Sequence, residues 1–406
     1  MIINLDCVPE IYLANHSIAK PKINHVDLTV DTTTGYRKKY PYIFQNSVYC
    51  TENKVYFVGV IHFYSLFNLL KFEDFVPQHI LEKVRNKEIL LALDLSAEAT
   101  HKLVENMYKK CINENVPTTQ VLLISSSADL IDSVIKFSNI HQIDPIKYEC
   151  YYKWEQFTQR NILMEMEMDV GSNDPVTFNL KSPLEREYHS KSFLCLMRSW
   201  RQHRGALLIL LKHRNLLDKG YVSFQNYSWW DFFHKQVIEE YKNSEIEEIL
   251  TLGYDIKNLL PLKVDDCNIG IFLHTNHMSR RLNPFYNDSL FSVVVETHFN
   301  NRYPFFCTEK VFKAILQKHP FLIVSTPNYL SNLRKLGYKT FDGLINEEYD
   351  TIIDPAKRLL KIVAEIERLS NLTTIELQNF KSKALDIVHH NYDILIKKTN
   401  FIHKIN

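Results

Sequence analysis

The chain has 406 residues, 45% of them apolar and 23% charged, which favours a globular protein with two domains over a disordered or fibrous one. Lysine plus arginine (48) nearly equals aspartate plus glutamate (47), so the total charge creates no general attraction to nucleic acid or anionic membranes. The nine glycines form neither a GxGxxG nor a Walker A sequence, which excludes the usual glycine-rich cradles for dinucleotides and ATP.

The cysteines and the start of the chain bear on where the protein works. The seven cysteines lie far apart without a CxxC pair, which disfavours a zinc site and a disulfide framework and favours reduced thiols. The opening MIINLDCVPEIYL has acidic residues where a signal peptide needs basic and then apolar ones, and no apolar run approaches membrane-spanning length. We therefore expect a cytoplasmic protein without a membrane span.

Short β-rich runs alternate with helical patterns from Lys54 to about Tyr148, as in the βαβ units of a parallel sheet. Strands are expected within residues 55–63, 88–95 and 120–125, and helices within residues 96–111 and 129–140. Around residues 160–190 the pattern weakens into a polar segment with glycine and proline, where we place the domain link.

The same rhythm resumes after the link and continues to the end of the chain. Strands are expected at residues 192–197, 268–275, 291–296 and 320–325, and helices from Gln202, after Thr308 and around residues 327–337. Asp354 before Pro355 starts a helix, and TTIE at residues 373–376 resembles a capping box. The sequence thus predicts an α/β protein with an N-terminal domain (1–180), a second domain (181–350) and C-terminal helices (351–406).

Three arginines surround the junction between a strand and the helix from Gln202. Arg198, Arg201 and Arg204 are spaced by three, and cations in a first helical turn oppose the helix dipole and repel one another. An anion beyond the carboxyl end of the strand, held by guanidinium groups, would offset this cost, with Arg204 as its favoured contact. The alternative is that these arginines pair with surface carboxylates.

Glu309 and Lys310 open the next such helix, after Thr308 as its N-cap. Glu309 agrees with the helix dipole, whereas Lys310 opposes it. This pair suits a lysine that reaches a diphosphate and a carboxylate that accepts from ribose hydroxyls. A capping acid beside a solvated lysine is the alternative interpretation.

Residues 191–211 and 291–342 together resemble the nucleotide-sugar domain of glycosyltransferases related to the α1,3-fucosyltransferases. The shared pattern is an arginine-bearing strand–helix junction, then F…E, a loop, TEK, a helix, and a proline that opens the next strand. The resemblance covers about residues 190–345 and looks closest to uncharacterised glycosyltransferases of large viruses and phages. It implies two Rossmann-like domains facing a cleft (the GT-B type), a nucleoside-diphosphate sugar as donor, and inverting transfer without an essential metal or other cofactor.

The resemblance also implies roles for single residues. Arg204 would meet the pyrophosphate, Glu309 the ribose and Lys310 the phosphates, and Glu296 would match the acid ahead of the loop. The chain departs from the family in Thr297, where an asparagine is usual, and in a phenylalanine where a tyrosine is usual. The donor is therefore not assumed to be GDP-fucose.

An inverting transfer needs a carboxylate base near the acceptor hydroxyl, and we expect it from the N-terminal domain at the carboxyl end of a strand. Asp94 and Glu98 are the candidates. The alternating MEMEMD (164–169) imitates metal-binding carboxylates, but its strict alternation favours a strand with one apolar face, so no metal is predicted.

Three functions remain open at this point. The leading hypothesis is a glycosyltransferase with a nucleotide-sugar donor and a glycan or another hydroxyl acceptor. A catalytically silent nucleotide or glycan binder is the second. The third is a phage-type transferase acting on modified DNA bases, which the near-zero net charge disfavours.

Overall fold

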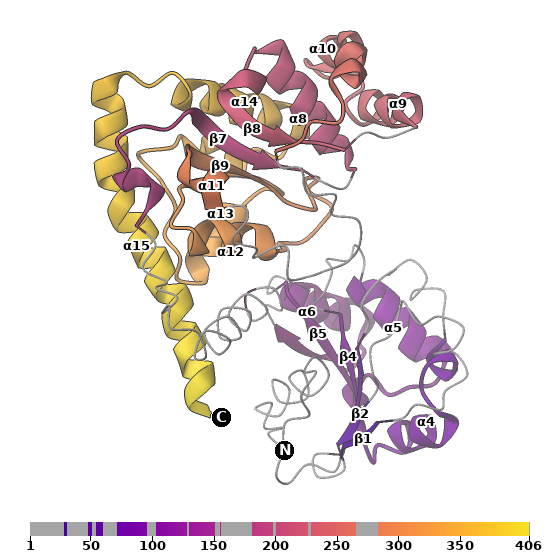
Figure 1. Cartoon of the computed structure of the whole chain (residues 1–406). Coiled ribbons are helices and arrows are strands. Elements are labelled where there is room, and N and C mark those ends of the chain that lie inside the picture. Colours follow the sequence, from indigo (N-terminus) through magenta and orange to yellow (C-terminus); the bar gives the residue numbers. More distant parts are fainter. Residues whose placement is uncertain are drawn as a thin grey trace. The chain divides into compact units, whose positions relative to one another are not determined.

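The computed structural model describes residues 28–30, 48–50, 54–59, 71–95, 103–127, 130–150, 155, 181–197, 200–225, 229–264 and 283–405. The chain divides into two compact units (Figure 1). The first comprises Met1–Lys153 with Pro304–Phe306, and the second comprises Trp154–Tyr303 with Cys307–Asn406. The second unit thus includes the C-terminal helices, and the predicted boundary at residue 180 lies outside the described residues.

The first unit contains a six-stranded sheet whose order follows the sequence, β1-β2-β3-β4-β5-β6. The edge strands β1 and β2 are antiparallel to their neighbours, whereas β3 to β6 are parallel. The bounds are β1 Leu28–Val30, β2 Val48–Cys50, β3 Val55–Gly59, β4 Leu90–Asp94, β5 Val121–Ser125 and β6 Lys147–Cys150, with helices η1 Phe72–Asp74, α4 Gln78–Arg85, α5 Leu103–Asn113, η2 Thr118–Gln120 and α6 Leu130–His141.

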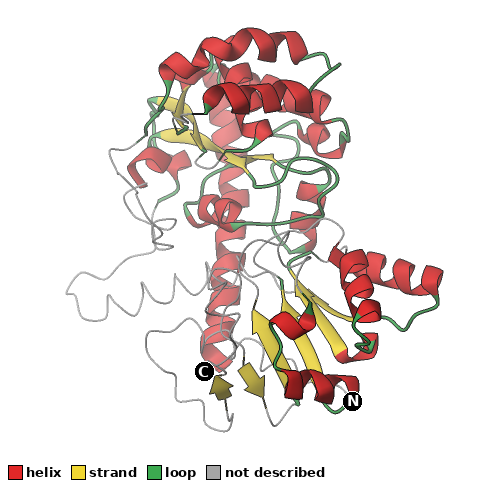
Figure 2. Ribbon diagram, turned by 90° about the vertical axis from the view of Figure 1, so that its right-hand side faces the viewer, coloured by secondary structure: helices red, strands yellow, loops and turns green. Residues whose placement is uncertain are grey.

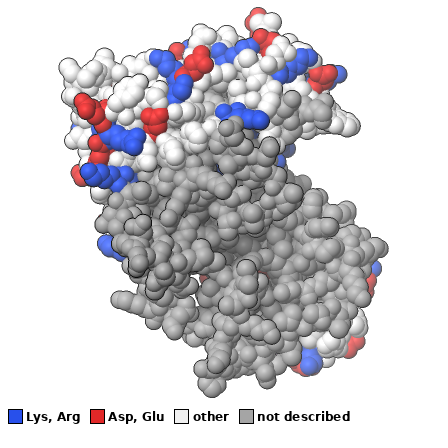
Figure 3. Space-filling view, in the orientation of Figure 1, with Lys and Arg blue, Asp and Glu red and all other residues white. Residues whose placement is uncertain are grey.

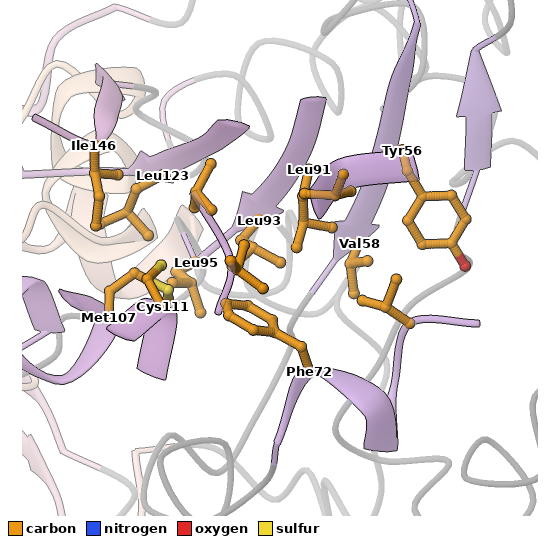
Figure 4. Packing of buried hydrophobic residues seen from close by; sticks show 14 of the residues in the cluster. Tyr56, Val58, Phe72, Leu91, Leu93, Leu95, Met107, Cys111, Leu123 and Ile146 are labelled. Atoms are coloured by element: carbon orange, nitrogen blue, oxygen red, sulfur yellow. The ribbon is translucent and has the colours of Figure 1, made fainter. Parts of the chain in front are cut away.

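One hydrophobic cluster of this unit lies on the helix-covered face of the sheet, because side chains in a strand alternate between its two faces. Leu91 and Leu93 of β4 and Leu123 of β5 point to the same side and pack with Met107 and Cys111 of α5 (Figure 4). Buried residues of α4 and α6 belong to the same cluster. Right-handed crossovers that advance in one direction along a sheet place their helices on one face, which accounts for the position of this cluster.

The second unit is built on a parallel four-stranded sheet in the order β10-β9-β7-β8, whose strands lie among helices in Figure 2. Every residue of the apolar run in β9 is buried, as is typical of a strand inside a parallel sheet. The strands are β7 Lys191–Leu196, β8 Gly220–Ser223, β9 Ser289–Val295 and β10 Phe321–Val324. The helices are η4 Pro183–Glu185, α8 Gln202–His213, η5 Leu217–Lys219, α9 Trp230–Glu240, α10 Glu247–Leu252, η6 Gly253–Leu259, α11 Asn283–Asn287, α12 Glu309–Leu316, α13 Tyr329–Lys335, η9 Glu347–Thr351, α14 Pro355–Leu369 and α15 Thr374–Ile405.

The strand order of the second unit fixes where a ligand site is expected. From β7 the chain goes to β8 on one side, and it then returns to add β9 on the other side of β7. The direction of winding therefore reverses between β7 and β9. In open α/β sheets, ligands bind outside the carboxyl ends of the strands at such a reversal. Among the described strands of the first unit the order shows no reversal of this kind.

The α/β class and the main elements that the sequence predicts are confirmed. Thr308 caps α12 by accepting from the N–H of Lys310, and Asp354 caps α14 by accepting from the N–H of Lys357. Two helices close the chain, as expected. The predicted strand at 268–275 and the alternating segment at 164–169 lie outside the described residues.

Candidate functional site

The first turn of α8 reaches across the reversal point from β7 to the carboxyl end of β9. The guanidinium group of Arg204 donates to the carbonyl oxygens of Val295 and Glu296 at 3.3 and 3.2 Å. The ring of His203 lies 3.1 Å from the same Glu296 carbonyl. Both side chains are buried, and burial together with the neighbouring Arg204 lowers the pKa of His203 well below its usual value. These bonds fix the backbone where β9 ends.

The carboxylate of Glu296 lies under this junction and is fully buried. It accepts from the Thr308 N–H at 3.2 Å, from the Thr308 hydroxyl at 2.5 Å and from the Tyr329 hydroxyl at 2.8 Å. The ammonium group of Lys310 lies 3.9 Å from it. Glu296 therefore joins the end of β9 to the starts of α12 and α13.

Lys310 stands at the partly open side of this arrangement, with 28% of its side chain exposed. Its ammonium group lies 3.0 Å from the Thr308 hydroxyl and 3.2 Å from a carboxylate oxygen of Glu309, whose side chain is 10% exposed. The pair predicted from the sequence is thus brought together with Glu296. The Lys310 side chain keeps some contact with solvent.

His298 lies three residues past the end of β9, where the charges of four cations act on it. Burial first, and then the charges of Arg201, Lys310, Arg204 and Arg302, lower the pKa of His298 to about 4. The ring stacks on Tyr303 with centroids 4.0 Å apart. These cations come from the start of α8, the loop after β9 and the start of α12, so distant segments deliver positive charge to one point of the carboxyl edge.

The loop that carries His298 and Arg302 is held by three helices. The Phe299 ring lies between the His203 ring of α8, at 5.3 Å, and the guanidinium group of Arg358 of α14, at 4.2 Å. Arg358 also donates to the Phe299 carbonyl. The side chain of Asn300 donates to Glu240 of α9 at 3.0 Å. Three separate contacts therefore fix the loop in place.

The predicted site residues fall into three groups. Arg201, Arg204, Glu296, Glu309 and Lys310 all lie at this edge of the second unit. Asp94 ends β4 in the first unit and is buried, with 1% of its surface exposed. Arg198 and Glu98 lie outside the described residues.

Burial and hydrogen bonding distinguish two kinds of residue among those at this edge. Arg204 and Glu296 are buried and hydrogen-bonded to the protein itself, which makes them organisers of the edge. Arg201 and Lys310 keep exposed surface.

Sequence reasoning missed His298, Arg302, Tyr329 and Arg358. A single histidine or arginine in a polar loop has no periodicity to mark it, and Arg358 lies on a helix whose cap explains its start. The only signal was the position of His298 three residues after an apolar strand.

The described residues place no three His, Cys, Asp or Glu side chains where they would hold a metal ion together. None of the described helices is both long and apolar enough to cross a membrane. Comparison with protein-family models, with curated proteins and with solved structures finds no match to this chain.

Proposed function

We propose that this protein is a glycosyltransferase that takes a sugar from a nucleoside-diphosphate donor. The observation that supports this best is the partly exposed Lys310 ammonium group, 3.9 Å from Glu296 at the carboxyl end of β9 and beside the winding reversal, where the charges of Arg201, Arg204 and Arg302 also act. A diphosphate is the leaving group of such a transfer, and fixed positive charge stabilises it as it departs. The positions of Arg204, Glu296, Glu309 and Lys310 also match the pattern of the fucosyltransferase-related enzymes that the sequence resembles.

The proposed roles follow from exposure and charge. Lys310, Arg201 and Arg302 bind the phosphate groups, because their side chains reach solvent. Glu309 accepts from the ribose hydroxyls. Arg204 is buried and fixes the end of β9 through its hydrogen bonds. Its positive charge adds to the electrostatic potential at the phosphates.

We propose a GT-B-type enzyme that inverts the anomeric centre and in which these cations take the part that a metal ion plays elsewhere. The acceptor is a glycan or another hydroxyl compound. Asp94 and Glu98 remain the candidates for the base that removes the hydroxyl proton.

A thermal-shift panel of UDP, GDP, CDP and their sugars identifies the donor. A ligand that binds only the folded protein raises the free energy of unfolding by about 2.7 kcal/mol at a hundred times its dissociation constant. The nucleotide that gives the largest shift is then titrated by calorimetry into Lys310→Ala. Loss of one charge-assisted contact, about 1.5–3 kcal/mol, weakens binding by about 10- to 150-fold.

Lys242→Ala is the matched control, because Lys242 is an exposed lysine of the same unit whose ion-pair partner is Glu239, outside this site. The control is expected to bind like the wild type. Unchanged nucleotide affinity in Lys310→Ala would contradict the proposal. Release of free sugar from the donor separates a transferase from a silent binder, which would hold the nucleotide without turnover.

A further inference from the structure

Two large aromatic side chains are exposed at the start of α9. Trp229, the N-cap residue, has 71% of its surface exposed, and Phe232 has 53%. Residues three apart lie on the same side of a helix, so these rings share one face. Neither ring has a role in the core, and exposed aromatic groups gathered at one place mark a site of contact.

A packed aromatic cluster supports these two residues from below. The ring of Trp200 lies 4.6 Å from Phe233, 5.9 Å from Trp230 and 6.1 Å from Phe224. A Cβ atom on Gly205 of α8 would lie 2.7 Å from the Trp200 ring, so the glycine allows the indole to lie against the helix. The start of α9 is therefore fixed relative to α8, in agreement with the close grouping of α8, α9 and α10 in Figure 1.

The cluster also joins the exposed rings to the cations. Trp200 is followed directly by Arg201, which donates to the Trp200 carbonyl at 2.8 Å. Because Arg201 is one of the four cations around His298, the aromatic cluster and the cation group meet at this residue.

The strand order gives the separation of the two strand ends from which these regions follow. α9 follows the carboxyl end of β8, the cations lie at the carboxyl end of β9, and β7 runs between the two strands. Neighbouring strands lie about 4.8 Å apart, so the two ends are roughly 10 Å apart along the same edge. That is comparable to the separation between the base and the terminal phosphate of a nucleoside diphosphate.

We propose that Trp229, aided by Phe232, forms the stacking surface for the nucleobase of the donor. This inference rests on the proposed function and adds the position of the base to it. The nucleotide would lie along the carboxyl edge from β8 to β9, with its base on the Trp229 ring and its phosphates among the cations. Stacking on an aromatic ring tolerates any base, so the surface supplies affinity, and polar contacts select the nucleotide.

The test compares ligands with and without a base. UDP, GDP, CDP and inorganic pyrophosphate are titrated by calorimetry into the full-length wild type, Trp229→Ala, Trp229→Phe and Ile375→Ala. Ile375 is the matched control, because it is an apolar side chain of the same unit with 79% exposure, in the first turn of α15. Since Trp229 is mostly exposed, its replacement leaves the fold intact, which is checked by thermal unfolding.

We expect Trp229→Ala to weaken the preferred nucleoside diphosphate by about 5- to 150-fold, the range that stacking of one base supplies. Pyrophosphate affinity stays unchanged, Trp229→Phe keeps most of the nucleotide affinity, and Ile375→Ala binds every ligand like the wild type.

Two results overturn this inference while the proposed function stands. One is nucleotide affinity in Trp229→Ala equal to that of the wild type. The other is an equal loss for nucleotide and pyrophosphate, which would place Trp229 at the phosphates instead. If only acceptor-dependent turnover falls and nucleotide binding does not, the ring serves the acceptor and the inference is wrong. If the wild type binds none of the nucleotides, the proposed function fails as well.

Discussion

Glu296 is a buried acid whose oxygens are engaged by donors from two helix starts. A carboxylate in this position is stable because three hydrogen bonds and a nearby ammonium group replace the water it loses. The same bonds leave it poorly placed to accept a proton from a substrate. Its role is to hold Thr308 and Tyr329 so that the neighbouring Lys310 is presented correctly.

Replacement of Glu296 by glutamine tests this role. An amide has one acceptor oxygen, so its NH₂ group must face one of the donors from Thr308 or Tyr329. We expect Glu296→Gln to lower the free energy of unfolding by about 1.5–3 kcal/mol, measured by urea denaturation. Glu348→Gln is the control, because that side chain is 71% exposed and pairs only with Lys361 at 3.7 Å, and its effect should stay within about 0.5 kcal/mol. Equal stability of the two variants would show that Glu296 organises nothing.

His319 of the second unit is fully buried. His319 accepts at Nδ1 from the Ser292 hydroxyl, 2.7 Å away, and donates from Nε2 to the Ser289 carbonyl at 2.8 Å. Protonation would turn the accepting nitrogen into a donor that faces a hydroxyl already oriented toward it. Burial lowers the pKa of His319 to about 3.

This depressed pKa predicts acid sensitivity. Below about pH 6.5 the unfolded chain binds a proton at this position, while the folded chain does not until about pH 3, so the free energy of unfolding falls as the pH is lowered. The loss per group approaches about 1.4 kcal/mol per pH unit. Urea denaturation between pH 7.5 and 5 should show a smaller fall for His319→Gln than for the wild type. Identical slopes in the two proteins would refute the assignment, since the other titrating groups are common to both.

At the scale of whole elements, α15 shows how a local signal starts a helix. The Thr373 hydroxyl and N–H both bond to the carboxylate of Glu376, at 2.7 and 2.8 Å, and the N–H of Glu376 donates back to the hydroxyl at 3.3 Å. This is the capping box predicted from TTIE. It satisfies donors that the first turn of a helix leaves open.

Removal of this cap gives a measurable effect. We expect Thr373→Ala to lower the free energy of unfolding by about 1 kcal/mol in chemical denaturation. Thr374→Ala, one residue into the same exposed turn, should change it by less than about 0.5 kcal/mol, because the side chain of Thr374 takes no part in the cap. If both changes cost the same, helix propensity rather than capping sets the start of α15.

The elements were predictable from the sequence to the extent that their causes are local. Alternation and apolar runs marked β4, β5, β7, β9 and β10, and caps marked α12, α14 and α15. What the sequence does not contain is the pairing over distance. The donors to Glu296 lie 12 and 33 residues away, and the contact of Arg358 with Phe299 spans 59 residues. The family pattern marks Glu296 as the acid ahead of the loop, but the residues that bond to it become visible only in the structure.

At the scale of the whole molecule, the two units have separate cores, but they differ in the number of tryptophans that can report their unfolding. All four tryptophans, at positions 154, 200, 229 and 230, belong to the second unit. Tryptophan emission therefore follows unfolding of that unit, while far-ultraviolet circular dichroism follows both.

We expect the two probes to give different midpoints in urea, because chains with more than one core depart from two-state unfolding. The nucleotide chosen in the thermal-shift panel should raise the urea midpoint of tryptophan emission, since the proposed site lies within the second unit. The part of the dichroism change that belongs to the first unit should keep its midpoint. Coincident midpoints, with and without nucleotide, would mean that the units unfold as one body.

Acidic and basic side chains are interspersed on the described surface of the second unit in Figure 3. The candidate site follows the same rule. Its four cations, Arg201, Arg204, Arg302 and Lys310, stand beside three carboxylates, Glu240, Glu296 and Glu309, which leaves a net charge of +1 (4 − 3). A group of charges so nearly balanced exerts little attraction beyond a Debye length, about 8 Å in physiological salt. Added salt should therefore lower the association rate of the ligand only slightly. A long polyanion such as duplex DNA would meet no extended positive surface at this group of side chains.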